Sequence, residues 1–188
     1  MKKIKHILFS LLLFISSPLF ASPRIQISEF NISGNTLSLA FNLREAANQE
    51  LLALIFSNRA VRIAYKIDIL KKEGIFRKDS VAWGSLSLNS LIRFDAFSRV
   101  FTVDYREGNT ESRKKFVRTS NMRKTIRMIV SHFFNKIWRV NVPLNTLDRS
   151  RNSFTLRITA WIESVKLAPP YNIINSSFNF KIEELRDF

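Results

Sequence analysis

Cysteine is absent from this chain of 188 residues, and glycine occurs only 4 times and proline 5 times. Without cysteine there is no disulfide framework, zinc finger, iron–sulfur cluster, thiol nucleophile or lipidated N-terminal cysteine. So few glycines leave little room for phosphate-binding loops. These absences exclude several classes of enzyme and of metal-binding domain.

The residues that are present are typical of a folded chain with a strong basic excess. Hydrophobic residues make up 46% and charged residues 24%, a composition of globular rather than disordered proteins. Lysine and arginine number 30 against 15 aspartates and glutamates, which gives a formal net charge of +15. An acidic partner is therefore expected.

The N-terminus has the pattern of a secretory signal peptide. The basic stretch Met1–Lys5 precedes the apolar run Ile7–Phe20, and the small residue Ala21 stands at the expected cleavage site. That run has 14 residues, fewer than the roughly 20 that a membrane-spanning helix needs. We expect residues 1–21 to be removed and residues 22–188 to form one periplasmic domain. The alternative is a retained N-terminal anchor.

Export changes which acidic partners are relevant. A cytosolic protein this basic would be expected to bind nucleic acid, an interpretation that survives only if Ala21 is not a cleavage site. Outside the inner membrane the abundant polyanions are lipid head groups, lipopolysaccharide, wall polymers and acidic proteins. We therefore expect no nucleic-acid partner.

Alternating apolar residues predict strands along most of the chain. Gly34-Asn35 is a hairpin signal, Asp95–Ser98 a turn, and Arg106–Lys115 a charged loop. Helical spacing predicts two helices, Glu45–Phe56 and Asn121–Asn135, the second with Ser120 as its N-cap. The expected strands are Arg24–Ser33, Thr36–Leu43, Val61–Ile69, Leu86–Phe94, Arg99–Tyr105, Ile137–Val142 at a sheet edge, Ser153–Val165 and Phe178–Ile182.

About eight strands and two helices, with short connections and no repeating strand–helix rhythm, predict a mainly β (β-rich α+β) fold. An antiparallel, immunoglobulin-like β-sandwich with the two helices in its connections fits this pattern best.

The sequence contains no residue pattern that is typical of a catalytic site. His132 is the one histidine beyond the expected signal peptide, and no Gly-x-Ser-x-Gly motif occurs. Asp68 and Asp104 alternate with basic residues on strands, so we expect them to balance charges across the solvent face of a sheet. We predict no catalytic residues, no cofactor and no metal site.

The strongest anomaly is the segment Ser112–Leu147, which contains no acidic residue. Its helix is amphipathic, and such helices lie on anionic membranes in some proteins and only face solvent in others. In both cases this segment is the expected face for an acidic partner. The candidate binding residues are Arg113, Lys114, Lys115, Arg123 and Arg127.

A second anomaly is a pair of tryptophans on strand faces that alternate away from the predicted core. Trp83 alternates with Ser85 and Ser87, and Trp161 alternates with Arg157. Exposed tryptophan beside arginine is the composition of protein-binding hot spots. The alternative is that a helix covers this face and buries both rings. Trp83, Arg157 and Trp161 are therefore the remaining candidate binding residues.

Several segments, in this order, resemble bacterial domain-of-unknown-function family 4390. They are Ile25–Leu43, Arg62–Asp68, Leu91–Val103, and Arg157–Glu163 running into Lys166–Tyr171 and Phe178–Phe180. The chain departs from the family's pattern in its Lys/Arg content and at Glu73–Lys78, where an aromatic-rich segment is expected. The resemblance implies an exported protein with no assigned activity, and a sensory accessory role near a membrane sensor kinase.

Together these observations predict a non-enzymatic periplasmic binding protein whose partner is another envelope protein, in particular a membrane sensor kinase. The alternative is a peripheral protein that binds anionic lipid or lipopolysaccharide through the basic segment 113–139. A third hypothesis, a small-ligand carrier with a cleft between its sheets, is supported by no particular residue.

Overall fold

A computed structural model describes residues 23–71, 80–144, 147, 154–164 and 171–180. The expected signal peptide and the segment Glu73–Lys78 lie outside this part of the chain. The elements, in chain order, are β1 (Arg24–Ser33), β2 (Thr36–Arg44), α2 (Gln49–Phe56), β3 (Val61–Lys71), β4 (Ser80–Asp95), β5 (Val100–Glu107), β6 (Thr110–Val117), α3 (Met122–Ile129), the π-helical turn η1 (Val130–Phe134), β7 (Trp138–Pro143), β8 (Phe154–Ser164) and β9 (Tyr171–Phe180).

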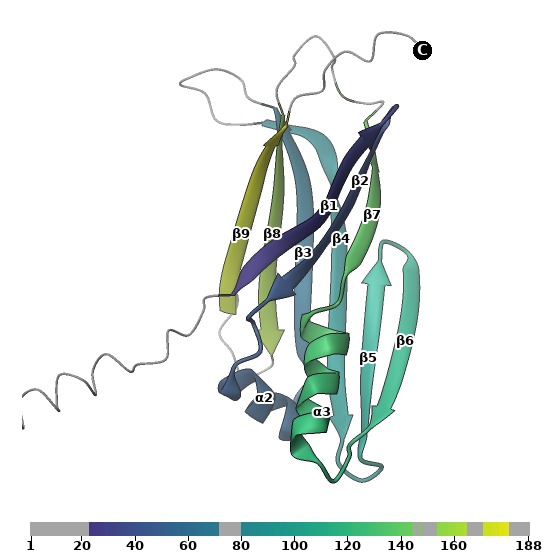
Figure 1. The fold of residues 1–188 in the computed structure, drawn as a ribbon, viewed down its shortest axis with the longest axis vertical. Helices are drawn as coiled ribbons and strands as arrows, with labels where there is room; N and C mark the ends of the chain where they lie inside the picture. The colour runs from purple at the N-terminus through teal and green to yellow at the C-terminus, as the bar shows by residue number, and fades with distance from the viewer. Residues whose placement is uncertain (1–22, 72–79, 145–146, 148–153, 165–170, 181–188) are drawn as a thin grey trace, which may run out of the picture.

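The strands form two antiparallel sheets that pack face to face (Figure 1). The large sheet has six strands in the order β6-β5-β4-β3-β8-β9, and the small sheet has three in the order β1-β2-β7. The predicted mainly β, antiparallel sandwich is thus confirmed, and its immunoglobulin-like character stays a prediction. β7 is an edge strand of the small sheet, as expected from its closing proline, Pro143.

Two hairpins whose two-residue turns begin with glycine set the register of the strands they join. Gly34 and Gly108 have φ of +56° and +55°, the left-handed region that a two-residue hairpin requires at its first position. The first hairpin pairs Ser33 with Thr36, and the second pairs Glu107 with Thr110. Only the first was predicted.

The second hairpin corrects one expectation. Arg106–Lys115 is not a charged loop, because Thr110–Val117 forms β6, and the described residues hold nine strands rather than about eight. All of its side chains except Phe116 are exposed, since β6 lies at the edge of the large sheet. An edge strand with polar residues on both faces lacks the alternation that identifies buried strands.

The core lies between the two sheets. Alternate residues of β3, among them Ile63, Tyr65 and Ile67, are fully buried and meet the inward residues of β2. The Phe41 and Tyr65 rings make an edge contact across the sandwich at 5.6 Å. Burying one such aliphatic or aromatic side chain contributes about 1.5–3 kcal/mol, so this layer is the main source of stability.

Both helices lie on the inner side of the large sheet, over the end that the small sheet leaves uncovered (Figure 1). α2 buries Leu51 and Ile55, and α3 buries Ile129. The N-cap of α3 is Asn121, whose Oδ1 accepts a hydrogen bond from the Lys124 N–H at 3.1 Å. The prediction of Ser120 as the N-cap is therefore wrong by one residue.

The π-helical turn η1 explains how two consecutive residues reach the core. The Asn135 N–H donates to the Val130 carbonyl at 2.7 Å, a spacing of five residues. Phe133 and Phe134 are both fully buried, and their rings meet at 4.9 Å. In a regular helix, neighbouring side chains point in directions about 100° apart, so one of the two would be expected at the helix flank.

Candidate binding surfaces

The outer face of the large sheet, the side turned away from the small sheet, carries two of the three residues predicted from the tryptophan pattern. Arg157 is exposed and Trp161 is half-buried, in the alternation predicted for β8. No described helix covers this face, because α2 and α3 both pack on the inner side. Trp83 pairs with Ile69 through the backbone, and its side chain lies outside the described part.

The Trp161 indole is held by a small polar cluster. Its Nε1–H donates to Glu163 Oε1 at 2.7 Å, and Glu163 also forms an ion pair with Arg62 at 3.4 Å. Opposite Trp161 in the neighbouring strand is Ala64, whose small side chain leaves room for the ring. The indole N–H is already satisfied, so a partner would contact the face of the ring.

Ion pairs run across the rest of the outer face. Lys66 Nζ lies 3.1 Å from Asp68, whose carboxylate is buried and opposes Arg157 in the sheet. Asp104 accepts from both Arg93 and Arg113. The expectation that Asp68 and Asp104 balance neighbouring cations is confirmed.

The basic segment 113–139 is divided between three environments. Arg113 points to the outer face and is neutralised by Asp104, which raises the pKa of its guanidinium. Lys114 points to the inner face, and Lys115 is exposed on the outer face. Arg123 and Arg127 lie on the exposed side of α3, one turn apart, as predicted. Only the last three of these have the open cationic character that the sequence suggested for all five.

His132 lies beside Lys114 and does not add a positive charge to this surface. Lys114 Nζ is 3.2 Å from His132 Nδ1, and the Phe116 ring lies 5.6 Å from the imidazole. Burial, and then the Lys114 charge, lower the pKa of His132 below its ordinary value of 6.5. The imidazole is therefore neutral at neutral pH and accepts from Lys114.

Three exposed apolar side chains at the end of the molecule where β4 turns into β5 were not predicted from the sequence. Phe97 is 100% exposed, Val117 59% and Met122 42%. Val117 pairs with Val100 at the base of the Asp95–Arg99 turn. The β4–β5 turn and the connection from β6 to α3 lie at the same end of the molecule (Figure 1).

Exposed cations stand on the same segments as these apolar side chains. Arg99, Lys115, Arg123 and Lys124 are exposed, and none of them forms an ion pair with a described residue. We name the set Phe97, Arg99, Lys115, Val117, Met122, Arg123, Lys124 and Arg127 the basic tip.

A rigid turn holds Phe97 in its exposed position. Asp95 Oδ1 accepts from the Phe97 N–H at 2.9 Å, and Asp95 Oδ2 accepts from the Ser98 hydroxyl at 2.6 Å. These bonds, the Ser98 one first, lower the pKa of Asp95. Arg99 closes the turn with φ of +57°. A phenylalanine in the middle of an Asp-x-x-Ser turn was the one signal that could have predicted this exposure.

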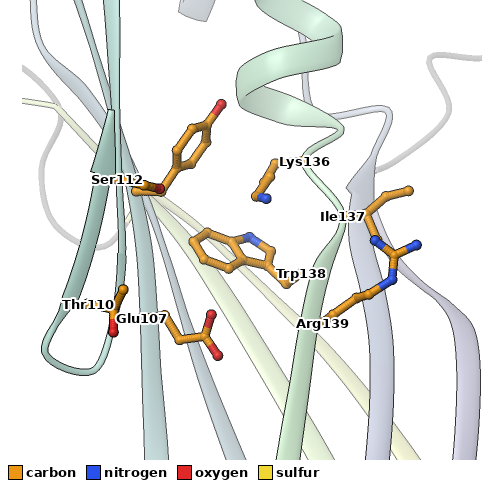
Figure 2. A pocket seen from close by; sticks show the side chains of 8 residues that line it. Glu107, Thr110, Ser112, Lys136, Ile137, Trp138 and Arg139 are labelled. Atoms are coloured by element: carbon orange, nitrogen blue, oxygen red, sulfur yellow. The ribbon is translucent and has the colours of Figure 1, made fainter. Parts of the chain in front are cut away.

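One cavity of about 190 Å³ lies between the β5–β6 hairpin and the start of β7 (Figure 2). Lys136 Nζ lies over two of its aromatic walls, 5.2 Å from the Tyr105 ring centre and 5.5 Å from that of Trp138. Pockets that enclose a small organic ligand measure roughly 300–1,000 Å³. The volume therefore does not favour the small-ligand carrier.

Among the described residues, no group of three or more His, Asp or Glu side chains is placed to hold a metal ion. No described helix combines the length and apolar character needed to cross a membrane.

No model of a known protein family matches the chain, and no curated protein or solved structure matches it either. The resemblance to family 4390 stays a prediction.

Proposed function

We propose that this is an exported, non-enzymatic binding protein of the cell envelope that docks on an anionic membrane surface through the basic tip. The observation that supports it most is Phe97, a fully exposed aromatic side chain on a turn braced by Asp95. Exposed apolar residues ringed by cations are typical of interfacial membrane-binding elements.

The charges of the basic tip support the same surface. Each lysine or arginine near an anionic bilayer contributes about 1 kcal/mol. The first turn of α3 contains Arg123 and Lys124 and no acidic residue, although the helix dipole favours anions there. Cations at this position oppose the dipole, and a layer of lipid phosphates would relieve that cost.

Vesicle binding by the purified residues 22–188 tests the proposal. We expect sedimentation with phosphatidylglycerol-containing vesicles but not with pure phosphatidylcholine, and release as salt shortens the screening length to about 3 Å. Phe97→Ala should weaken binding about tenfold or more, because burying a phenylalanine contributes about 1.5–3 kcal/mol.

Val81→Ala is the matched control, since Val81 is 58% exposed at the start of β4, the opposite end of that strand from Phe97. Its binding should equal that of the parent protein. Equal binding by Phe97→Ala and the parent, with both folded, would refute insertion of the tip. N-terminal sequencing of the native protein tests export, with Ser22 as the expected first residue.

The predicted envelope protein partner, such as a sensor kinase, is a second candidate. It is favoured by the position of Trp161 and Arg157 on a face that no described helix covers. Trp161→Ala should abolish crosslinking to one recurrent membrane protein in living cells while the fold is retained. A variant that unfolds, or one that still crosslinks, would count against this candidate.

A further inference from the structure

β6 forms an open edge of the large sheet. It is last in the strand order and pairs only with β5 among the described strands. Figure 1 shows no described element on its outer side. Seven of its eight side chains are exposed, so water has access to the whole edge.

The register shows which backbone groups of β6 lack a partner. In an antiparallel pair, residues alternate between those that exchange hydrogen bonds with the neighbouring strand and those whose N–H and C=O point away. The Arg118 N–H donates to the Arg99 carbonyl at 2.8 Å, so Arg99 and Arg118 are a hydrogen-bonded pair. Counting back along the regular ladder, the N–H and C=O groups of Arg113, Lys115 and Val117 point away from β5.

This edge lacks most of the devices that prevent strand addition. The β5–β6 ladder runs from Val100–Val117 to Glu107–Thr110 without a bulge. β6 contains no proline or glycine. Natural sheets otherwise protect an edge with charged side chains, above all lysine. Here those charges are Arg113, Lys114 and Lys115.

Charge determines which strand can add. In a second copy paired antiparallel about Lys114, Arg113 of one chain would oppose Lys115 of the other. In the register centred on Arg113, Glu111 would face Lys115, but the two Arg113 side chains would oppose one another, and like charges directly opposite destabilise a sheet. Lipid head groups would neutralise the cations, but they would not complete the ladder of backbone hydrogen bonds. An acidic peptide does both.

We propose that β6 accepts an extended, acidic segment of an envelope protein as an added strand of the large sheet. Main-chain hydrogen bonds to Arg113, Lys115 and Val117 supply affinity, and the side chains select the sequence. Acidic residues lie opposite Lys114 and Lys115, which present a positive charge on each face of β6, whereas Arg113 is already paired with Asp104. An apolar residue lies opposite the exposed Val117. This surface is distinct in mechanism from membrane docking, which needs no ladder.

Two variants at one position separate backbone pairing from charge. Lys115→Ala removes a charge, whereas Lys115→Pro also removes the outward N–H. Proline is tolerated on an edge strand where the N–H faces solvent, so both variants should fold. The probe is a short synthetic peptide that alternates glutamate with threonine and ends in valine, measured by fluorescence anisotropy. We expect Lys115→Pro to bind about tenfold more weakly than Lys115→Ala, as loss of one unshared hydrogen bond implies.

Amide hydrogen exchange on the unmodified protein is the second measurement. It tests strand addition even if the proline variant unfolds. The acidic peptide should slow exchange at Arg113, Lys115 and Val117, and a lysine-for-glutamate version of it should not. Equal binding by the two Lys115 variants would overturn the proposal. So would unchanged exchange, or slowing that follows protein concentration, which would indicate a second copy. Phe97→Ala should keep peptide binding, so failure of membrane docking leaves this result interpretable.

Discussion

On the outer face of the large sheet the cations have carboxylates beside them. Lys66 reaches Asp68, and Arg93 and Arg113 share Asp104. On the basic tip, Arg123 and Lys124 have no described acid beside them and lie at the same end of the molecule as the exposed Phe97. The two regions use the same residue types in different electrostatic settings.

The difference shows what each region's charge does. Paired charges across a sheet satisfy one another, so they stabilise the fold slightly and offer little to an anionic partner. Unpaired cations gain nothing within the fold, and their favourable interactions come only with an external anion. A basic net charge therefore says little about binding until the paired cations are set aside.

The largest expected effect is a difference in vesicle binding between variants of the basic tip and variants of the outer face. Arg123→Glu with Arg127→Glu should weaken binding to phosphatidylglycerol vesicles by a factor on the order of 1,000, from about 1 kcal/mol for each charge removed and again for each added. Lys66→Glu with Arg106→Glu makes the same change in net charge where cations are paired. It should lower the free energy of unfolding by about 2 kcal/mol and affect vesicle binding far less. Equal effects of the two pairs on binding would show that only net charge matters.

Asp104→Asn tests the comparison from the other side, because it leaves paired cations of the outer face without their carboxylate. Arg93 and Arg113 would lose their shared carboxylate, and we expect the free energy of unfolding to fall by about 1 kcal/mol. Vesicle binding should rise slightly, since the net charge increases. Denaturant titration and sedimentation measure the two quantities, and an unchanged stability would mean that this network contributes nothing to folding.

Arg123→Glu alone should stabilise the protein while impairing its binding. A carboxylate in the first turn of α3 interacts favourably with the helix dipole, so the free energy of unfolding should rise by about 0.5 kcal/mol. Arg139→Glu, at an exposed position of β7, controls for a general effect of reduced net charge on stability. A destabilised Arg123→Glu would argue that this arginine has a structural role.

The smallest effect concerns His132. Its pKa is lowered in the folded protein, so the unfolded chain takes up a proton first as the pH falls. Stability is complete above about pH 6.5 and decreases as the pH drops from there toward the folded pKa. His132→Gln should remove this part of the pH dependence in denaturant titrations between neutral and mildly acidic pH. Lys114→Met should reduce it, because the Lys114 charge is one of its causes.

Much of the fold was predictable because its signals are local. Alternation along Val61–Ile69 identifies a strand whatever its neighbours are, and Gly34-Asn35 specifies a tight hairpin from two residues. The two features that local signals failed to predict also have physical reasons. β6 is polar on both faces because it lies at an edge, so no periodicity marks it, and the Asn121 cap was missed by one residue because Ser120 fits the same role.

The sequence by itself determined the strand pattern, the basic excess and the acid-free segment from Ser112 to Leu147. Only the tertiary structure decided which of those cations are neutralised by a carboxylate and which are not. Arg113 meets Asp104 because the β5–β6 hairpin sets them opposite one another across neighbouring strands. Phe97 is exposed because its turn extends past the end of the core, where none of the described elements covers it. Both outcomes depend on contacts between segments, and such contacts leave no trace in local periodicity.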